Sequence, residues 1–159
     1  MPAYEVTNQN DGTPAAMSAT PLTQLALYTL TATLRRLNIY EFILGIADAP
    51  AANTILWECL RFTAPGTLTA TTPNALDPAD ASAVAPGTAG VWCTAEPTYT
   101  AKSTLDYRPV NQQVTQTWVS AGSQGNLVIP AVNNNGIGWR SSSAVYVGTG
   151  ARVSAKYWT

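Results

Sequence analysis

The carboxylates that could carry out chemistry are few in this chain. Glu41, Glu58 and Glu96 are the candidates for the acid–base pair of an enzyme that cleaves polysaccharides. Glu41 and Glu58 fall in strand-like runs, where we expect each to pair with an arginine. The 159-residue chain has no histidine, so it lacks the base of a Ser-His or Cys-His nucleophile and the commonest metal ligand. The composition favours a protein that is not an enzyme, and we predict no catalytic residue and no cofactor.

Two short segments carry oxygen ligands of the kind that calcium binds. Asp77 and Asp80 form one, and residues 8–11 form the other. Neither has the spaced acidic loop of a calcium motif. Turn formation explains residues 8–11, and Asp77 followed by Pro78 is typical of the start of a short helical turn over residues 77–82. We therefore predict that the chain binds no metal ion.

Aromatic residues are the other group that could form a site, with five tryptophans and seven tyrosines. Their ring faces could stack on sugars. Alternatively, Trp57 and Trp118 anchor the core, while Trp92, Trp139 and Trp158 lie at sheet ends or in an oligomer interface, where such residues are enriched. We favour this packing role over a sugar-binding platform.

The two cysteines, Cys59 and Cys93, each lie in an apolar run beside a tryptophan. We interpret both as small buried hydrophobic residues. A disulfide between them is the alternative, and the sequence does not give the distance that would decide it.

The segments that must position these residues have the period-two alternation of β-strands. Residues 97–107, 110–119 and 152–158 alternate apolar and polar side chains, as half-buried antiparallel strands do. Residues 37–46 and 55–62 are apolar on both faces, which is typical of central strands. Frequent Gly, Pro and Asn turns separate the runs. This pattern predicts an all-β fold, a single antiparallel β-sandwich or jelly-roll-like domain.

Three further segments define the extent of this domain and its connections. Residues 22–34 contain β-branched threonines and are predicted as a further strand. Residues 1–19 are polar and are predicted as an N-terminal arm outside the sandwich, which then spans residues 20–159. We expect deletion of residues 2–18 to leave the melting temperature nearly unchanged. Residues 71–90 are rich in Ala, Pro and Asp and are predicted as a long loop.

Charged residues make up only 11% of the chain, against about 25% in a typical globular protein. So few charges favour a surface that is covered by a partner or by other copies of the chain. The net charge of −1 provides no basic field for nucleic acid. No apolar run reaches the ~18 residues of a membrane span, and no signal peptide is visible, so we expect a soluble protein made in the cytoplasm.

The order of several short segments resembles a type of small structural protein encoded by tailed bacteriophages, often near the major capsid protein gene. These segments cover most of residues 35–155 and are RLNIYEF at 36–42 leading to Gly45, LWE at 56–58, RFT at 61–63, TPNALDPAD at 72–80, TAEPTY at 94–99, NLVIP at 126–130 and NGIG at 135–138. The resemblance implies a virion component, a capsid decoration (cement) protein of mainly β fold. It brings no catalytic residues.

Such proteins sit on the outer capsid surface as homo-oligomers, often trimers, and bridge major capsid subunits. The resemblance therefore implies two partners, the major capsid protein of the same phage and other copies of this chain, with assembly in the cytoplasm of the host bacterium. We expect the arm and the loop at 71–90 to contact the shell. The adjacent Arg35 and Arg36 form either a solvated turn or a contact for an acidic partner. The residues assigned to partner contacts are Tyr4, Arg35, Arg36, Asp77, Asp80, Trp92, Trp139, Tyr146 and Trp158.

The alternative from a different class is a carbohydrate- or receptor-binding β-sandwich module of a phage fibre or tail. Titration with glycans, followed by tryptophan fluorescence, would separate the two.

Overall fold

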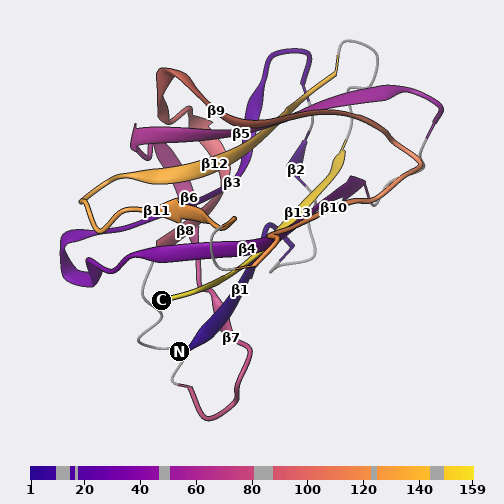
Figure 1. Ribbon diagram of the computed structural model, residues 1–159. Helices are drawn as coiled ribbons and strands as arrows, with labels where there is room; N and C mark the ends of the chain where they lie inside the picture. Colours follow the sequence, from indigo (N-terminus) through magenta and orange to yellow (C-terminus); the bar gives the residue numbers. More distant parts are fainter. Residues whose placement is uncertain (10–14, 17, 47–50, 81–87, 123–124, 144–148) are drawn as a thin grey trace.

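The computed structural model describes residues 1–9, 15–16, 18–46, 51–80, 88–122, 125–143 and 149–159. This part of the chain folds into two antiparallel sheets that pack against each other (Figure 1). The seven-stranded sheet runs in the order β10 (Gln116–Val119), β4 (Leu37–Ile46), β13 (Thr149–Trp158), β1 (Ala3–Thr7), β7 (Asn74–Ala75), with β11 (Leu127–Ile129) paired to β4 and β2 (Ala15–Ala16) paired to β13. The six-stranded sheet runs in the order β6 (Thr67–Thr71), β8 (Thr88–Ala95), β3 (Leu22–Tyr28), β12 (Gly136–Ser142), β5 (Thr54–Ala64), β9 (Thr98–Asn111). The prediction of an all-β sandwich is confirmed.

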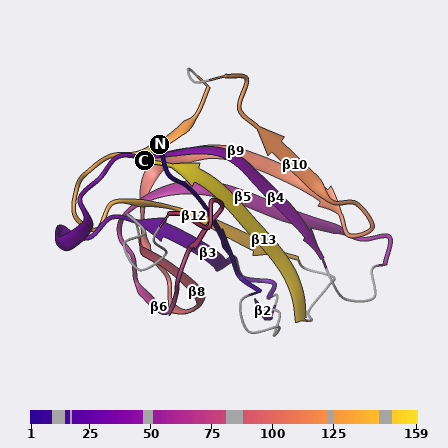
Figure 2. The same ribbon diagram turned by 90° about the horizontal axis from the view of Figure 1, so that it is seen from below.

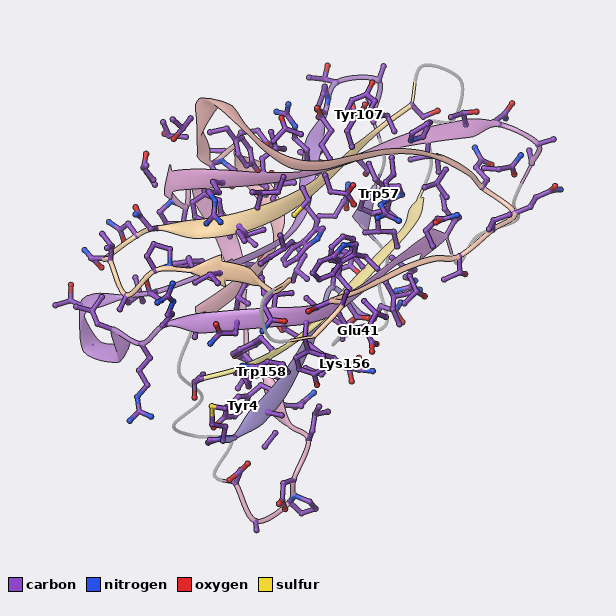
Figure 3. The ribbon with its side chains drawn as sticks, viewed as in Figure 1. Tyr4, Glu41, Trp57, Tyr107, Lys156 and Trp158 are labelled. Carbon is purple, nitrogen blue, oxygen red and sulfur yellow. The ribbon has the colours of Figure 1, made fainter. Side chains whose placement is uncertain are left out.

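The core lies between the two sheets and follows from the alternation of the strands. Trp57 of β5 and Trp139 of β12 are each 1% exposed, and the Trp139 ring lies 5.8 Å from that of Phe42 on β4. Trp118 of β10 also stacks against Phe42, at 5.1 Å. Figure 3 shows Trp57 between the sheets and Tyr107 at the periphery. The prediction that Trp57 belongs to the core is confirmed, whereas Trp118 is partly exposed and packs against the core from its edge.

Both cysteines are buried free thiols. Cys59 of β5 faces the main core, whereas Cys93 of β8 lies outside that cluster. The interpretation of these residues as small buried hydrophobic side chains is confirmed, and the alternative disulfide is wrong.

The strand predicted over residues 22–34 ends early, at Tyr28. The next residue, Thr29, is fully buried, and its side chain donates to the carbonyl of Val132 at 2.6 Å. Its backbone N–H also bonds to Asn135, so the chain leaves the sheet at this point and is held by the turn before β12. Residues Thr31–Thr33 then form a 3-10 turn, η1, which is the one helical element among the described residues. No helix in this part of the chain has the length and apolar character needed to cross a membrane.

The start of the chain is part of the sandwich, which corrects the predicted arm over residues 1–19. β1 lies between β13 and β7, and its Tyr4 and Val6 are 3% and 1% exposed. Asn8, which follows β1, is fully buried and donates from Nδ2 to the Ala151 carbonyl at 2.9 Å, while its Oδ1 accepts from the N–H of Val153 at 3.1 Å. Only two apolar residues alternate in this polar segment, so the local pattern is weak. The distant strand β13 supplies the pairing.

The six-stranded sheet is built around one long, bent hairpin. Residues of β5 and β6 pair with β9 and β8, from Thr54 opposite Asn111 to Thr71 opposite Ala89. The bend falls at Gly66, whose φ of 71° suits glycine and where an added Cβ atom would lie 2.1 Å from the Ala95 carbonyl oxygen. Because β8 pairs with β3 and β5 pairs with β12, the two halves of the hairpin enclose the β3–β12 pair.

A second, smaller hydrophobic cluster lies on the side of this sheet that faces away from the main core. Leu60 and Phe62 of β5 are 5% and 2% exposed, although neither belongs to the main core cluster. The Phe62 ring contacts Tyr28 and Tyr99, each in an edge-on arrangement at 6.1 Å. Tyr99 follows the bend of the hairpin, so the bend covers this cluster.

Candidate binding face on the seven-stranded sheet

The side of the seven-stranded sheet that faces away from the core carries the exposed polar and aromatic residues. Along β13, Val153, Ala155 and Tyr157 are buried, and the residues between them are partly exposed. Figure 2 shows this side, with β13 running between β4 and β1. We call it the outer face; it consists of Glu5 of β1, Arg152, Ser154, Lys156 and Trp158 of β13, Tyr40, Glu41, Ile43 and Gly45 of β4, and Thr117 and Val119 of β10.

An aromatic pair occupies one end of the outer face. The rings of Tyr40 and Trp158 stack with centroids 4.6 Å apart and planes 18° apart. Burial raises the pKa of the Tyr40 phenol above its ordinary value. Both rings are partly exposed, so this pair is available to a partner.

The same end of the sheet gathers four of the residues predicted to contact a partner. Trp158 lies in register with Asn38, two residues after Arg36. On its other side Trp158 lies in register with Ala3. The Ala3 carbonyl accepts a hydrogen bond from the N–H of Leu76, and Asp77 is the next residue in the chain. Arg35, Arg36 and Asp77 are exposed. We call this group, Arg35, Arg36, Asp77 and Trp158, the terminal end; the two chain termini lie beside it in Figure 1.

An ion pair crosses the middle of the outer face. Lys156 Nζ lies 2.7 Å from Glu41 Oε1, and the two residues are register partners on β13 and β4 (Figure 3). This hydrogen bond raises the pKa of Lys156 above its ordinary value. Glu5 of β1 is the register partner of Lys156 on its other side. The row Glu5–Lys156–Glu41 therefore carries two carboxylates for one ammonium group.

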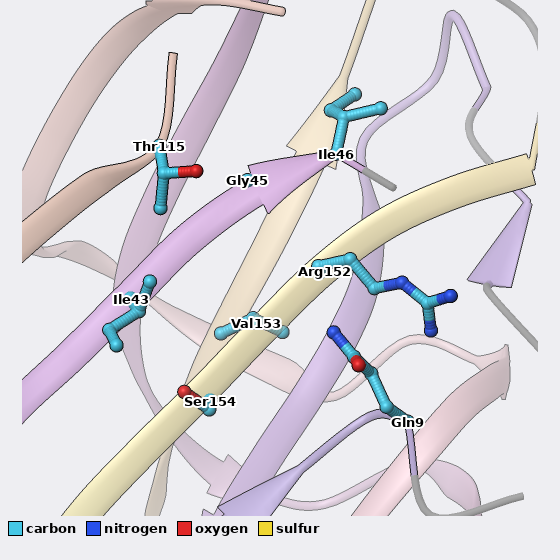
Figure 4. A pocket seen from close by; sticks show the side chains of 8 residues that line it. All are labelled: Gln9, Ile43, Gly45, Ile46, Thr115, Arg152, Val153 and Ser154. Atoms are coloured by element: carbon cyan, nitrogen blue, oxygen red, sulfur yellow. The ribbon is translucent and has the colours of Figure 1, made fainter. Parts of the chain in front are cut away.

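A cavity of about 250 Å³ opens at the opposite end of the outer face (Figure 4). It is lined by Gln9, Ile43, Gly45, Ile46, Thr115, Arg152, Val153 and Ser154. Arg152 is the register partner of Gly45, and the missing side chain at Gly45 leaves the space beside the arginine open. Sequence reasoning missed this cavity because Gln9 and Thr115 reach it from segments far apart in the chain. The alternation along β13 had nevertheless placed Arg152 on the same face as Lys156.

The remaining predicted contacts do not lie on the outer face. Tyr4 and Trp139 are 3% and 1% exposed and belong to the main core, so their assignment to partner contacts is corrected. Tyr4 stacks on Tyr157 at 5.6 Å, and Trp139 packs on Phe42. Tyr146 and the side chain of Trp92 lie outside the described residues.

The predicted loop over residues 71–90 is in part ordered against the sheet. Asn74–Ala75 form β7, which pairs with β1, and residues 81–87 lie outside the described part. Asp77 Oδ1 accepts from the N–H of Ala79 at 2.9 Å, and the Asp77 carbonyl accepts from the N–H of Asp80 at 3.0 Å. Up to Asp80 this segment is a turn in which Asp77 bonds to the backbone. Among the described residues no three His, Cys, Asp or Glu side chains gather as metal ligands.

The three glutamates considered for catalysis are each engaged by the fold. Glu58 pairs with Arg140 at 2.6 Å, as predicted, whereas Glu41 pairs with a lysine instead of an arginine. Glu96 accepts hydrogen bonds from the backbone N–H and the hydroxyl of Thr23, at 2.8 and 2.6 Å. These contacts hold the carboxylates of Glu41 and Glu58 within the sheets and that of Glu96 against the start of β3.

Comparisons with known proteins provide no relative for this chain. No protein-family model matches it, and neither a curated protein nor a solved structure does.

Proposed function

We propose that this protein is a non-enzymatic structural component of a tailed-bacteriophage virion, a decoration protein that binds the outer surface of the major capsid protein lattice. The resemblance over residues 35–155 supports this function. The main structural support is the terminal end. There, strand register brings four of the predicted contact residues together at one end of the two-sheet body.

The terminal end suits contact with an acidic protein surface. The exposed guanidinium groups of Arg35 and Arg36 can donate charge-assisted hydrogen bonds to carboxylates on the shell. The partly exposed ring of Trp158 adds apolar and aromatic area of the kind enriched in interfaces. A protein that binds only the assembled lattice stabilises that lattice by mass action.

Two exposed valines are better candidates for an interface between copies of this chain than the tryptophans predicted for that role. Val114, just before β10, and Val119, its last residue, are 47% and 61% exposed, and β10 is an edge strand of the seven-stranded sheet. An edge strand has unpaired backbone groups that can pair with another chain. We propose that the β10 edge forms the contact of a homo-oligomer, most simply a trimer.

The test of decoration uses particles that lack this protein. Purified protein is added, and bound copies are counted relative to the major capsid protein. We expect saturable binding at a fixed ratio and a higher melting temperature of the particle. Binding to a purified glycan, seen as a saturable tryptophan fluorescence shift, together with no binding to particles, would overturn the proposal in favour of a receptor-binding module.

A pair of charge-matched variants locates the contact. Arg35→Gln with Arg36→Gln removes two positive charges from the terminal end. Thr69→Glu with Thr94→Glu adds two negative charges to exposed positions of β6 and β8, on the other sheet. Both variants change the net charge by the same amount. The arginine variant should bind particles at least about tenfold more weakly, with reduced salt sensitivity, and the threonine variant should bind like the parent. Equal loss in both would place the contact elsewhere.

A further inference from the structure

We infer that the cavity beside Arg152 is a binding site for a single carboxylate group with a short aliphatic stem. The inference concerns the isolated protein and does not depend on the proposed decoration of a capsid.

The first argument is the state of the Arg152 side chain. Its Nε and Nη1 atoms are out of contact with solvent and have no hydrogen-bond partner in the described part of the chain. Buried polar groups are almost always paired, because an unpaired N–H costs free energy, and more so when the group is charged. Lys156 and Arg140 bear the same charge but are each paired with a glutamate. Arg152 is therefore a cationic donor whose partner the described chain does not supply.

The second argument is the chemistry of the other walls. Among the described residues that line the cavity, none is acidic. Ser154 and Thr115 have hydroxyl groups, and Gln9 has an amide, so each can donate a hydrogen bond to an anion. In Figure 4 the Arg152 side chain extends outward from β13, and the Gln9 side chain extends from β1's side toward β13 beneath it. One positive charge surrounded by neutral donors suits a monoanion.

The third argument is size and shape. The volume of about 250 Å³ is several times the ~30 Å³ that a water molecule occupies in the liquid, yet below the range of typical drug-sized ligand pockets. The wall formed by the Ile43 side chain is apolar and suits a few methylene groups. An acidic side chain or a small free acid has both parts. A phosphate dianion would leave one of its charges without a cation, because the described part of the lining has no lysine and no second arginine.

The experiment follows the Nε–H resonance of Arg152 by NMR in the ¹⁵N-labelled full chain. Sodium propionate, sodium phosphate and sodium chloride are titrated at equal ionic strength. We expect a saturable shift with propionate, half-maximal at about millimolar concentration, and only a small linear shift with the other two salts. N-acetylglutamate amide in a second arm presents the carboxylate as a protein side chain does. Tighter binding of this compound than of propionate would identify a side chain as the natural source, and the reverse order would identify a free acid.

Two variants test the assignment from different sides. Arg152→Gln removes the cation. Ser154→Val keeps the cation but places a methyl group in the cavity at a strand position where a β-branched residue is well tolerated. Each should weaken propionate binding at least about tenfold, read in Arg152→Gln from the backbone N–H resonance of residue 152 because the side-chain resonance is lost, while Arg36→Gln should leave binding unchanged. In the Ser154→Val variant the Arg152 resonance itself reports the loss, so the test holds even if Arg152→Gln fails to fold.

Specific outcomes overturn the inference. They are a propionate shift no larger than that of chloride, saturation that persists in Ser154→Val, or phosphate binding tighter than propionate binding. Because these titrations contain no particles, their failure leaves the proposed decoration function standing. Conversely, failure of decoration leaves the carboxylate site standing.

Discussion

The hydroxyl oxygens of Tyr99 and Thr23 lie 2.6 Å apart where the bend of the long hairpin crosses the six-stranded sheet. Thr23 Oγ1 also lies 2.6 Å from Glu96 Oε2. A carboxylate can only accept, and a hydroxyl has a single proton, so Thr23 donates to Glu96 and Tyr99 donates to Thr23. Arg140, paired with Glu58, lies 5.1 Å from the centre of the Tyr99 ring. The bend is thereby held to the first residues of β3 by a directed chain of hydrogen bonds.

We predict that this chain contributes measurably to stability. Glu96→Ala leaves both the N–H and the hydroxyl of Thr23 without their acceptor, and it should lower the free energy of unfolding by about 2–3 kcal/mol. Tyr99→Phe removes one donor and should cost about 1 kcal/mol. Urea denaturation measures both, with the exposed Thr98→Ala as the control. A change below about 0.5 kcal/mol for Glu96→Ala would mean that the bend is held by packing alone.

The N-terminal segment should be essential to the fold. Deleting residues 2–8 removes the strand between β13 and β7 and uncovers the core at Tyr4 and Val6, so we expect the protein not to fold cooperatively. Asn8→Ala should cost about 2–3 kcal/mol, because it leaves the buried N–H of Val153 and carbonyl of Ala151 without their side-chain partner. Gln9→Ala, at an exposed position, should have little effect. Melting curves followed by circular dichroism measure these effects. An unchanged melting temperature for Asn8→Ala would contradict the prediction.

Stability should decrease in alkaline solution. Burial and the nearby Glu96 carboxylate raise the pKa of Cys93 to about 12, and burial also raises the pKa values of Cys59, Tyr99 and Tyr157. Above about pH 9 the unfolded chain loses cysteine protons that the folded chain retains. The unfolded state is then favoured by about 1.4 kcal/mol per pH unit for each such group, so stability is complete below pH 9 and falls above it.

Cys93→Ala isolates one contribution to this slope. Between pH 9 and 11 the variant should lose stability less steeply than the parent in urea titrations. If Cys93 ionised equally in the folded and unfolded states, the variant and the parent would lose stability with pH at the same rate. That result would refute the raised pKa of Cys93.

Two glycines should respond differently to the same substitution. A Cβ at Gly136 would lie 2.4 Å from Phe62 Cζ and 2.5 Å from the Leu27 carbonyl oxygen, so Gly136→Ala should cost about 3 kcal/mol. At Gly45 the nearest atom, Thr115 Oγ1, would be 3.3 Å away, and Gly45→Ala should cost less than about 1 kcal/mol. Chemical denaturation of both variants provides the comparison. Similar losses at the two positions would show that the packing around Gly136 can relax.

The exposed β10 edge should mediate self-association. Val119→Asp places a charge in this strand, and natural proteins use such charges to protect sheet edges from pairing. We expect light scattering to give an oligomeric mass for the parent at micromolar concentration and a monomeric mass for the variant. Val132→Asp, at a valine that is 50% exposed in the turn before β12, is the control and should stay oligomeric. A monomeric parent at all concentrations would exclude this interface in the free protein.

The sequence alone determined several strands, two from continuous apolar runs and one from alternation. Leu37–Ile46 was predicted with the bounds that the structure has, and residues 55–62 and 152–158 fall within β5 and β13. The reason is local, because the pleat of a strand sends successive side chains to opposite faces whatever the partner strand is. The burial of Cys59 and the pairing of Glu58 with an arginine likewise follow from their strand positions.

Only the tertiary structure decided which side chains meet. Tyr4 is a core residue whose ring stacks on Tyr157, and Trp139 is a core residue that packs on Phe42; in each pair the two rings come from distant parts of the sequence. Asn8 bonds to residues 143 and 145 positions further along the chain, and no local pattern encodes that contact. The Arg152 cavity arises in the same way, since it needs Gly45 opposite the arginine and Thr115 beside it. Strand pairing at long range depends on the free energy of the whole fold, and it therefore settles what alternation along a single strand leaves open.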